Sequence, residues 1–213
     1  MIRISCTNLE QVRVAPAQHG KMIATIEKPK SSGRRGMFTC WQEAASSYHT
    51  TNVSVSETVK LLQKKFMQFD ENLVNSRRQA KLADQLTNYC ALYEKSKFEF
   101  IDSKHHMNWD IVDGVRLTGN TPWVVHNSDG YFSFIPVEQP IDWQTQLRFP
   151  LIQQYLSSNH IECDVTEMRV GVYCLTTNKF EFKVYSTNEI QMFISETGEI
   201  FQTVLDEFNK WKK

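Results

Sequence analysis

Long hydrophobic runs are absent from this 213-residue sequence, and glycine and proline are scarce, with 8 and 6 residues. No segment approaches the roughly 18 uninterrupted apolar residues of a membrane-spanning helix, so we expect no membrane partner. The scarcity of glycine and proline excludes a collagen-like or low-complexity chain. A disordered chain is excluded because apolar residues make up 41% and the formal net charge is zero. The composition is that of an ordinary globular protein.

Cysteine is sparse and has no metal-binding or disulfide pattern. The five cysteines are widely spaced, odd in number and without a C-x-x-C pair. This argues against both a disulfide framework and a structural zinc site, so we expect buried free thiols. The N-terminal residues carry no long apolar stretch that would serve as a targeting signal, and we therefore expect a cytoplasmic protein.

Several catalytic signatures are also missing. The sequence contains no G-x-x-x-x-G-K-[ST] loop, no G-x-G-x-x-G, no G-x-S-x-G and no H-E-x-x-H. Nucleotide hydrolysis, dinucleotide binding and serine hydrolase chemistry are therefore disfavoured.

Charge is distributed unevenly although it cancels overall. Residues 1–100 carry 15 basic and 9 acidic side chains, and residues 101–213 carry 9 and 15. The basic half indicates a polyanionic partner, and a solvated surface with charges spread by chance explains it equally well. The candidate phosphate-binding side chains lie in a basic loop at 28–36 and on two helices: Arg34, Arg35, Lys60, Lys64, Lys65, Arg77, Arg78 and Lys81.

Hydrophobic periodicity predicts helices at both ends of the chain and strands between them. We expect helices over about 37–48, after a capping box at 54–57, after a second box at 76–79, over 142–158 and near the C-terminus. From residue 97 a period of two predicts strands at 98–100, 111–117, 123–125 and 131–137 and a hairpin over 168–185. An N-S-D-G turn at 127–130 joins two of these strands. The order favours a single mixed α/β or α+β domain, mainly helical and basic over 1–95, with a sheet core and closing helices over 96–213.

A short polar segment contains the densest group of potential metal ligands. Asp102, His105, His106 and Asp110 could together hold zinc or manganese. Their spacing matches no established zinc pattern, and a polar loop between two strands accounts for them as well.

The order of elements resembles the RecB-type branch of the PD-(D/E)XK nucleases, which includes the CRISPR-associated RecB-like exonucleases. The resemblance extends over most of the chain. It rests on residues 4–9 followed by 15–16, on Gly36 with Cys40 and Glu43, on 117–119, on 131–139 and on a helix start at Gln146 and Leu147. It implies an α/β fold of restriction-endonuclease type, with a mixed central sheet flanked by helices, and a DNA-processing role.

The positions that carry chemistry in that family are altered here. Cys40 stands where the family has a histidine, Pro122 where it has its first aspartate, and Gln139 where it has the lysine of (D/E)-x-K. Pro150 replaces the tyrosine of the Q-x-x-x-Y helix. Ala15 replaces a cysteine, and no cysteine follows Cys174, so an iron–sulfur cluster of the family type is not expected.

Metal-dependent phosphodiester cleavage needs at least two carboxylates converging on Mg²⁺ or Mn²⁺. By position the sequence offers one, Glu138, and only if the strand register slips by one residue. The resemblance therefore implies an impaired nuclease that binds DNA, or one subunit of a DNA-processing or defence complex, without a cofactor.

Two other hypotheses stay open. The first is an active Mg²⁺- or Mn²⁺-dependent deoxyribonuclease with a rearranged site. It would use Glu138 and Gln146 as catalytic residues, and Glu138, Asp110 and Glu99 as metal ligands. The second is a protein-interaction module that binds no nucleic acid. If the chain binds DNA, Trp41 or Trp123 would stack on bases. Packing in the core explains both residues under every one of these hypotheses.

Overall fold

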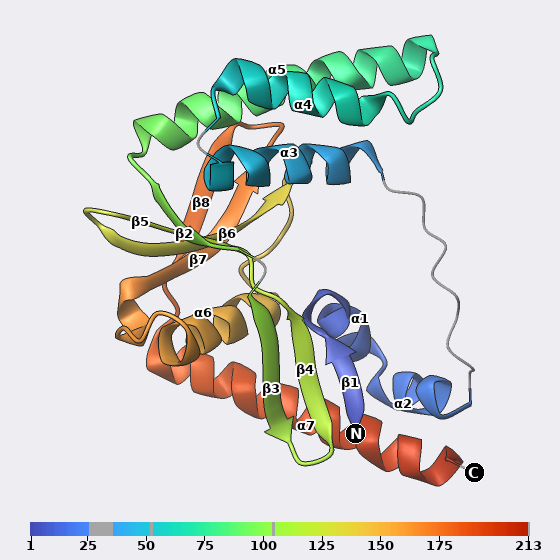
Figure 1. Cartoon of the computed structure of the whole chain (residues 1–213). Helices are drawn as coiled ribbons and strands as arrows, with labels where there is room; N and C mark the ends of the chain where they lie inside the picture. Colours follow the sequence, from blue (N-terminus) through green and yellow to red (C-terminus); the bar gives the residue numbers. More distant parts are fainter. Residues whose placement is uncertain (26–35, 52, 104, 213) are drawn as a thin grey trace.

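The computed structural model describes residues 1–25, 36–51, 53–103 and 105–212 (Figure 1). Arg34, Arg35 and most of the predicted basic loop lie outside these ranges, so their role stays a prediction. The described chain is α/β, with two mixed sheets flanked by helices.

A five-stranded sheet lies at the centre of the molecule, in the order β2-β5-β6-β7-β8. Strands β6 and β7 are parallel and the other neighbours are antiparallel. The predicted turn between β5 and β6 is confirmed: the Asp129 amide donates to Asn127 Oδ1 at 2.8 Å, and Gly130 takes a positive φ of 118°. The strands are β2 (Glu99–Asp102), β5 (Trp123–Asn127), β6 (Gly130–Val137), β7 (Met168–Cys174) and β8 (Lys179–Lys183).

A second sheet of three strands corrects the prediction of a single central sheet. Strand β4 (Val115–Asn120) lies between β1 (Ile2–Ser5), which is parallel to it, and β3 (His106–Val112), which is antiparallel. Strand β4 leads to β5 through Thr121 and Pro122, and Pro122 has no amide hydrogen with which to continue a ladder. The β3–β4 hairpin pairs with β1 instead, so the first 95 residues also supply a strand.

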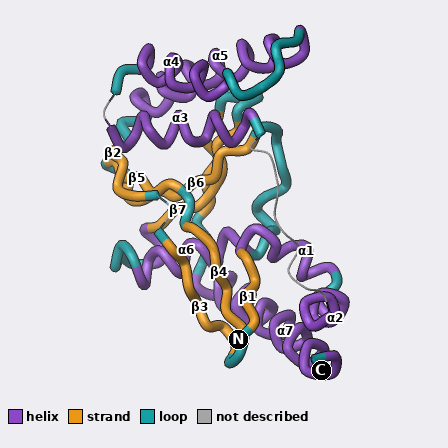
Figure 2. The backbone as a smooth tube through the Cα atoms, turned by 45° about the vertical axis from the view of Figure 1, so that its right-hand side comes forward, coloured by secondary structure: helices purple, strands orange, loops and turns teal. Residues whose placement is uncertain are grey.

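Helices cover both faces of the central sheet (Figures 1 and 2). Helices α3, α4 and α5 form a layer on one face, while α6 and α7 lie on the other, where α7 packs along α2 and the three-stranded sheet. None of the helices in the described ranges is long and apolar enough to cross a membrane. The helices are α1 (Leu9–Val14), α2 (Pro16–Thr25), α3 (Met37–Thr51), α4 (Val55–Phe66), α5 (Leu73–Lys95), α6 (Arg148–Asn159) and α7 (Thr187–Trp211), with short 3-10 turns at Cys6–Asn8 and Val165–Glu167.

One predicted capping box is confirmed and the other is wrong. Ser54 and Glu57 form the expected pair of hydrogen bonds, in which the Ser54 amide donates to Glu57 Oε2 at 2.9 Å. Helix α4 begins directly after Ser54. Helix α5 starts three residues before the predicted box at Ser76. Its N-cap is Asn72, whose Oδ1 accepts from the Asn75 amide at 2.9 Å. Asparagine and serine are both favoured N-cap residues, and here Asn72 is the N-cap.

Two hydrophobic cores lie on opposite faces of the central sheet. In β6, Phe132 and Phe134 belong to the core beneath α3–α5, whereas Ile135 packs against the core beside α6 and α7. This alternation is the period of a strand that is buried on both faces. Trp41 and Trp123 lie in the core beneath α3–α5, where they are 0% and 6% exposed. Both therefore pack inside the protein, as the core alternative predicted.

Candidate functional site

A pocket of about 390 Å³ lies where α3 approaches the ends of β4, β5 and β6. It brings together Glu43, one of the residues that carry the resemblance, and Pro122, which stands where the family has its first aspartate. Glu138, the expected carboxylate, is not among its lining residues. The wall includes Thr121, Pro122, Pro136, Glu43, Arg148 and Ile152.

The lining of this pocket does not fit a nuclease metal ion. Among the described residues that line it, Glu43 is the one carboxylate, and its Oε2 accepts a hydrogen bond from Lys65 Nζ at 2.7 Å. Pro122 and Pro136 present no ligand atom from their side chains. Magnesium and manganese prefer several oxygen ligands, with carboxylates among them, so this donor set does not hold either ion in the expected way.

Hydrogen-bond donors take the place of metal ligands in the pocket. The Nε of Arg148 and the Oγ1 of Thr121 are both buried, and neither has a hydrogen-bond partner among the described residues. Burial lowers the pKa of Arg148, and it raises the pKa of the neighbouring Cys6 thiol to about 12. Cys6 is therefore a neutral thiol and not a nucleophile.

Arg148 reaches this place because α6 begins later than periodicity predicted. The helix starts at Arg148 instead of residue 142, and its first internal hydrogen bond runs from the Leu151 amide to the Leu147 carbonyl. Pro150 therefore lies in the first turn, where an amide would have no partner in the helix. Gln146 precedes the helix, and its side-chain amide donates to the Asp142 carbonyl at 2.8 Å. It is not among the residues that line the pocket.

Glu138 lies just beyond the end of β6 and contacts α5. Its two carboxylate oxygens lie 2.8 and 3.2 Å from Arg78 Nη2. The Thr176 hydroxyl donates to the Glu138 carbonyl at 2.6 Å and fixes the local backbone. The carboxylate is thus an ion-pair partner of a helix arginine.

A second depression, of about 440 Å³, lies between α5 and the segment that follows β6. Three exposed cations line it, Arg77, Arg78 and Lys81, with Glu138 as the one carboxylate among its described lining residues. Gln139 also lines it. We call this depression the cationic groove, defined by Arg77, Arg78, Lys81, Leu82, Gln85, Glu138, Gln139 and Thr176.

Among the described residues, the predicted phosphate-binding lysines of α4 do not line the groove. Lys60 and Lys64 are exposed on α4, one helical turn apart. Lys65 forms the ion pair with Glu43 described above. The position of the lost family histidine, Cys40, is buried on α3, where its sulfur accepts from Gln68 Nε2 at 3.2 Å.

The predicted metal ligands Glu138, Asp110 and Glu99 are not brought together. Asp110 lies on β3 of the three-stranded sheet, where its oxygens accept from Arg116 at 2.6 and 2.7 Å. These hydrogen bonds hold the pKa of Asp110 below its usual range. Glu99 is exposed at the start of β2 in the other sheet.

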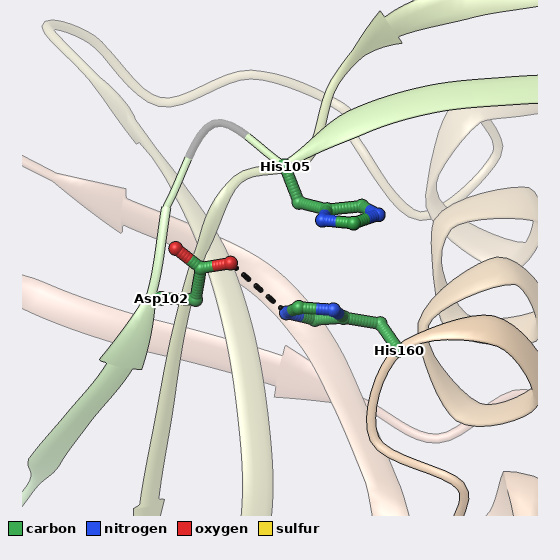
Figure 3. Close-up of side chains that lie close together, drawn as sticks. All are labelled: Asp102, His105 and His160. Carbon is green, nitrogen blue, oxygen red and sulfur yellow. Dashed lines mark ion pairs between the residues drawn. The ribbon is translucent and has the colours of Figure 1, made fainter.

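A different group of potential metal ligands does lie close together. Asp102 and His105 were both in the polar segment that the sequence singled out, but the structure replaces His106 and Asp110 with His160. His160 Nε2 lies 3.1 Å from Asp102 Oδ2, and the rings of His105 and His160 are stacked with centroids 4.3 Å apart (Figure 3). Sequence reasoning missed His160 because it follows α6, more than 50 residues later, and no local spacing links it to the others.

No protein-family model matches the chain, and no curated protein matches it significantly. The resemblance to the RecB-type nucleases stays a prediction.

Proposed function

We propose that this chain binds nucleic acid through the cationic groove and does not cleave it, as a restriction-endonuclease-like protein with a degenerate active site. The observation that carries the proposal is the gathering of Arg77, Arg78 and Lys81 around a single carboxylate. The pocket at the expected nuclease centre supports the proposal that the chain does not cleave nucleic acid, because its one described carboxylate is bound to Lys65.

The spacing of the groove cations suits a phosphate backbone. Arg77 and Lys81 are one helical turn apart, which separates them by about 6 Å along the axis of α5. Phosphates of one DNA strand recur every 3.4 Å of helix axis, so alternate phosphates lie about 7 Å apart along that axis. Contacts of this kind fix position on the backbone and carry no sequence information, so we propose sequence-independent binding.

The interaction-module alternative has less support. A module of this kind predicts an exposed apolar patch on the acidic residues 101–213. The large apolar side chains exposed there lie on β2, on the loop after β6 and on α7: Ile101, Ile141, Met192 and Trp211. The last of these is covered in part by Lys21, whose Nζ lies 3.8 Å from the ring centroid.

Fluorescence anisotropy with labelled single- and double-stranded DNA tests binding. If all three cations contact phosphates of a duplex, log K falls with log salt with a slope of about −2.7, or roughly 40-fold between 50 and 200 mM. The double variant Arg77→Gln/Lys81→Gln should reduce the slope to about −0.9. Arg78 is left intact because its removal would also release Glu138.

Lys95→Gln is the matched control, because Lys95 is an exposed cation at the far end of the same helix, about 21 Å from Lys81. It should bind as the unmodified protein does. Binding that is independent of salt, or a loss in Lys95→Gln equal to that of the double variant, would overturn the proposal.

A cleavage time course on end-labelled DNA with Mn²⁺ tests the proposal that the chain does not cleave nucleic acid. We expect intact DNA over the whole course. Cleavage that disappears in Glu43→Gln would show a working metal site in the pocket, and cleavage that disappears in Glu138→Ala would show one beside the groove. Either result would contradict the proposal that the active site is degenerate.

A further inference from the structure

We propose that Asp102, His105 and His160 form a binding site for a divalent transition metal ion of the zinc type. One potential ligand atom from each residue lies within 4.8 Å of the other two. The site is separate from both the pocket and the cationic groove, and the inference does not depend on the proposed function.

The tertiary fold assembles this cluster from three segments. Asp102 is the last residue of β2, in the central sheet, and His105 lies directly before β3, in the other sheet. His160 caps the C-terminal end of α6, where its amide donates to the Leu156 carbonyl at 3.2 Å. Asp102 and His105 therefore both lie near the C-terminal end of α6, and the three side chains meet there (Figure 3).

Backbone contacts hold two of the ligands in place. The Ser103 amide donates to Asp102 Oδ1 at 2.6 Å, which leaves Oδ2 directed at His160. The His105 carbonyl accepts from the Thr121 amide at 2.8 Å, which anchors the residue beside the start of β5. Interactions of this kind orient the ligands of metal sites in proteins.

Two imidazoles and a carboxylate are a ligand set that suits zinc and related borderline cations. Ligand atoms at about 2.0–2.1 Å from a tetrahedral zinc ion lie roughly 3.3 Å from one another. The 3.1 Å between Asp102 Oδ2 and His160 Nε2 already has this size. The His105 ring now stacks on His160 with an angle of 30° between the planes, so it must turn out of the stack to direct a nitrogen lone pair at the ion.

All three residues of the cluster are partly buried. Among the described residues, His160 Nε2 is buried and makes no hydrogen bond, and its one close polar neighbour is Asp102 Oδ2 at 3.1 Å. A ring nitrogen without a hydrogen bond is costly unless another partner satisfies it. The Asp102 side chain is 39% exposed, so an ion can enter from solvent and keep one position open to water.

Titration of the metal-free full-length protein with Zn²⁺, in competition with a chromogenic chelator, tests the site. We expect one ion per chain. His160→Gln, His105→Gln and Asp102→Asn should each weaken binding by about 100-fold or more, beyond the loss seen when only a supporting residue is removed. Far-ultraviolet circular dichroism and thermal unfolding without metal establish that each variant is folded.

His106→Gln is the matched control, because His106 is an exposed neighbour on β3 and is not in the cluster. It should bind Zn²⁺ within twofold of the unmodified protein. Substitution with Co²⁺ distinguishes this site from the five cysteines, because nitrogen and oxygen ligands give a visible spectrum without the intense near-ultraviolet thiolate band. No stoichiometric binding, undiminished binding in folded His160→Gln, or a thiolate spectrum would overturn the proposal.

Discussion

Lowering the pH from 7.5 to 5.5 should destabilise the protein through His49. This residue lies on α3, where its ring stacks on Phe100 with centroids 5.4 Å apart and its Nε2 lies 2.7 Å from the Tyr89 hydroxyl oxygen. Burial among these aromatic rings lowers the pKa of His49 from its ordinary 6.5 to about 3. The imidazole is therefore neutral in the folded protein throughout this pH range.

The sign and size of the effect follow from proton linkage. The unfolded chain protonates His49 below pH 6.5, whereas the folded protein does so only near pH 3. The unfolded state thus binds more protons, and the free energy of unfolding falls as the pH drops below 6.5 and continues to fall toward 3. The loss from this residue is about 1.4 kcal/mol at pH 5.5 and about 2 kcal/mol at pH 5.

Urea denaturation at pH 7.5 and 5.5 measures this loss when the unmodified protein is compared with His49→Gln. Glutamine retains an oxygen that can accept from Tyr89 but does not titrate. Burial also lowers the pKa of His19, and this residue is present in both proteins, so its contribution cancels in the comparison. The unmodified protein should lose about 1.4 kcal/mol more than the variant. Equal losses in the two proteins would refute the reasoning from burial.

Two further substitutions test contacts that hold the sheet and the last helix. In Gly171→Ala, on β7, the new methyl group would overlap the Glu181 carbonyl oxygen of β8, so we expect no cooperative unfolding transition. Gly36→Ala is the control, because Gly36 has open space around it, and this variant should unfold as the unmodified protein does. Ser186→Ala removes the N-cap of α7, whose hydroxyl accepts from the Glu189 amide at 3.3 Å, and should lower the free energy of unfolding in urea by about 1 kcal/mol.

Local patterns predicted the elements whose signals are complete within a few residues. The capping box at Ser54 and the turn at 127–130 are confirmed because both depend on hydrogen bonds between near neighbours. Strand β1 was missed because it has four residues, and its partner β4 lies more than a hundred residues away. Ile2 and Ile4 are buried there, but two apolar residues in alternation are too short a pattern to identify a strand.

The candidate sites depended more strongly on long-range structure. The sequence identified Arg77, Arg78 and Lys81 as cations of one helix, but it gave no sign that Glu138 would pair with one of them. It identified Asp102 and His105 but could not place His160 beside them. In each case one partner lies on a different element, and its distance is set by how helices pack on the sheets.

The groove and the pocket are adjacent, which bears on how the proposed binding would work. Pro136 lines the pocket and Glu138 lines the groove. Two residues of extended chain cover about 7 Å, so the end of β6 forms the boundary between the two depressions. Backbone phosphates held at Arg77 and Lys81 would place the next part of a nucleic-acid strand near this boundary.

The lining of the pocket agrees with the proposed loss of cleavage. Its wall is largely apolar, and Arg148 Nε and Thr121 Oγ1 are buried without a hydrogen-bond partner in the described part of the chain. Buried donors without partners are costly. In a nuclease this place would need converging carboxylates. Here Pro122 stands where the resemblance expects the first aspartate, and Glu43 is the one carboxylate in the described lining, so the pocket does not offer the converging carboxylates that metal-dependent cleavage needs.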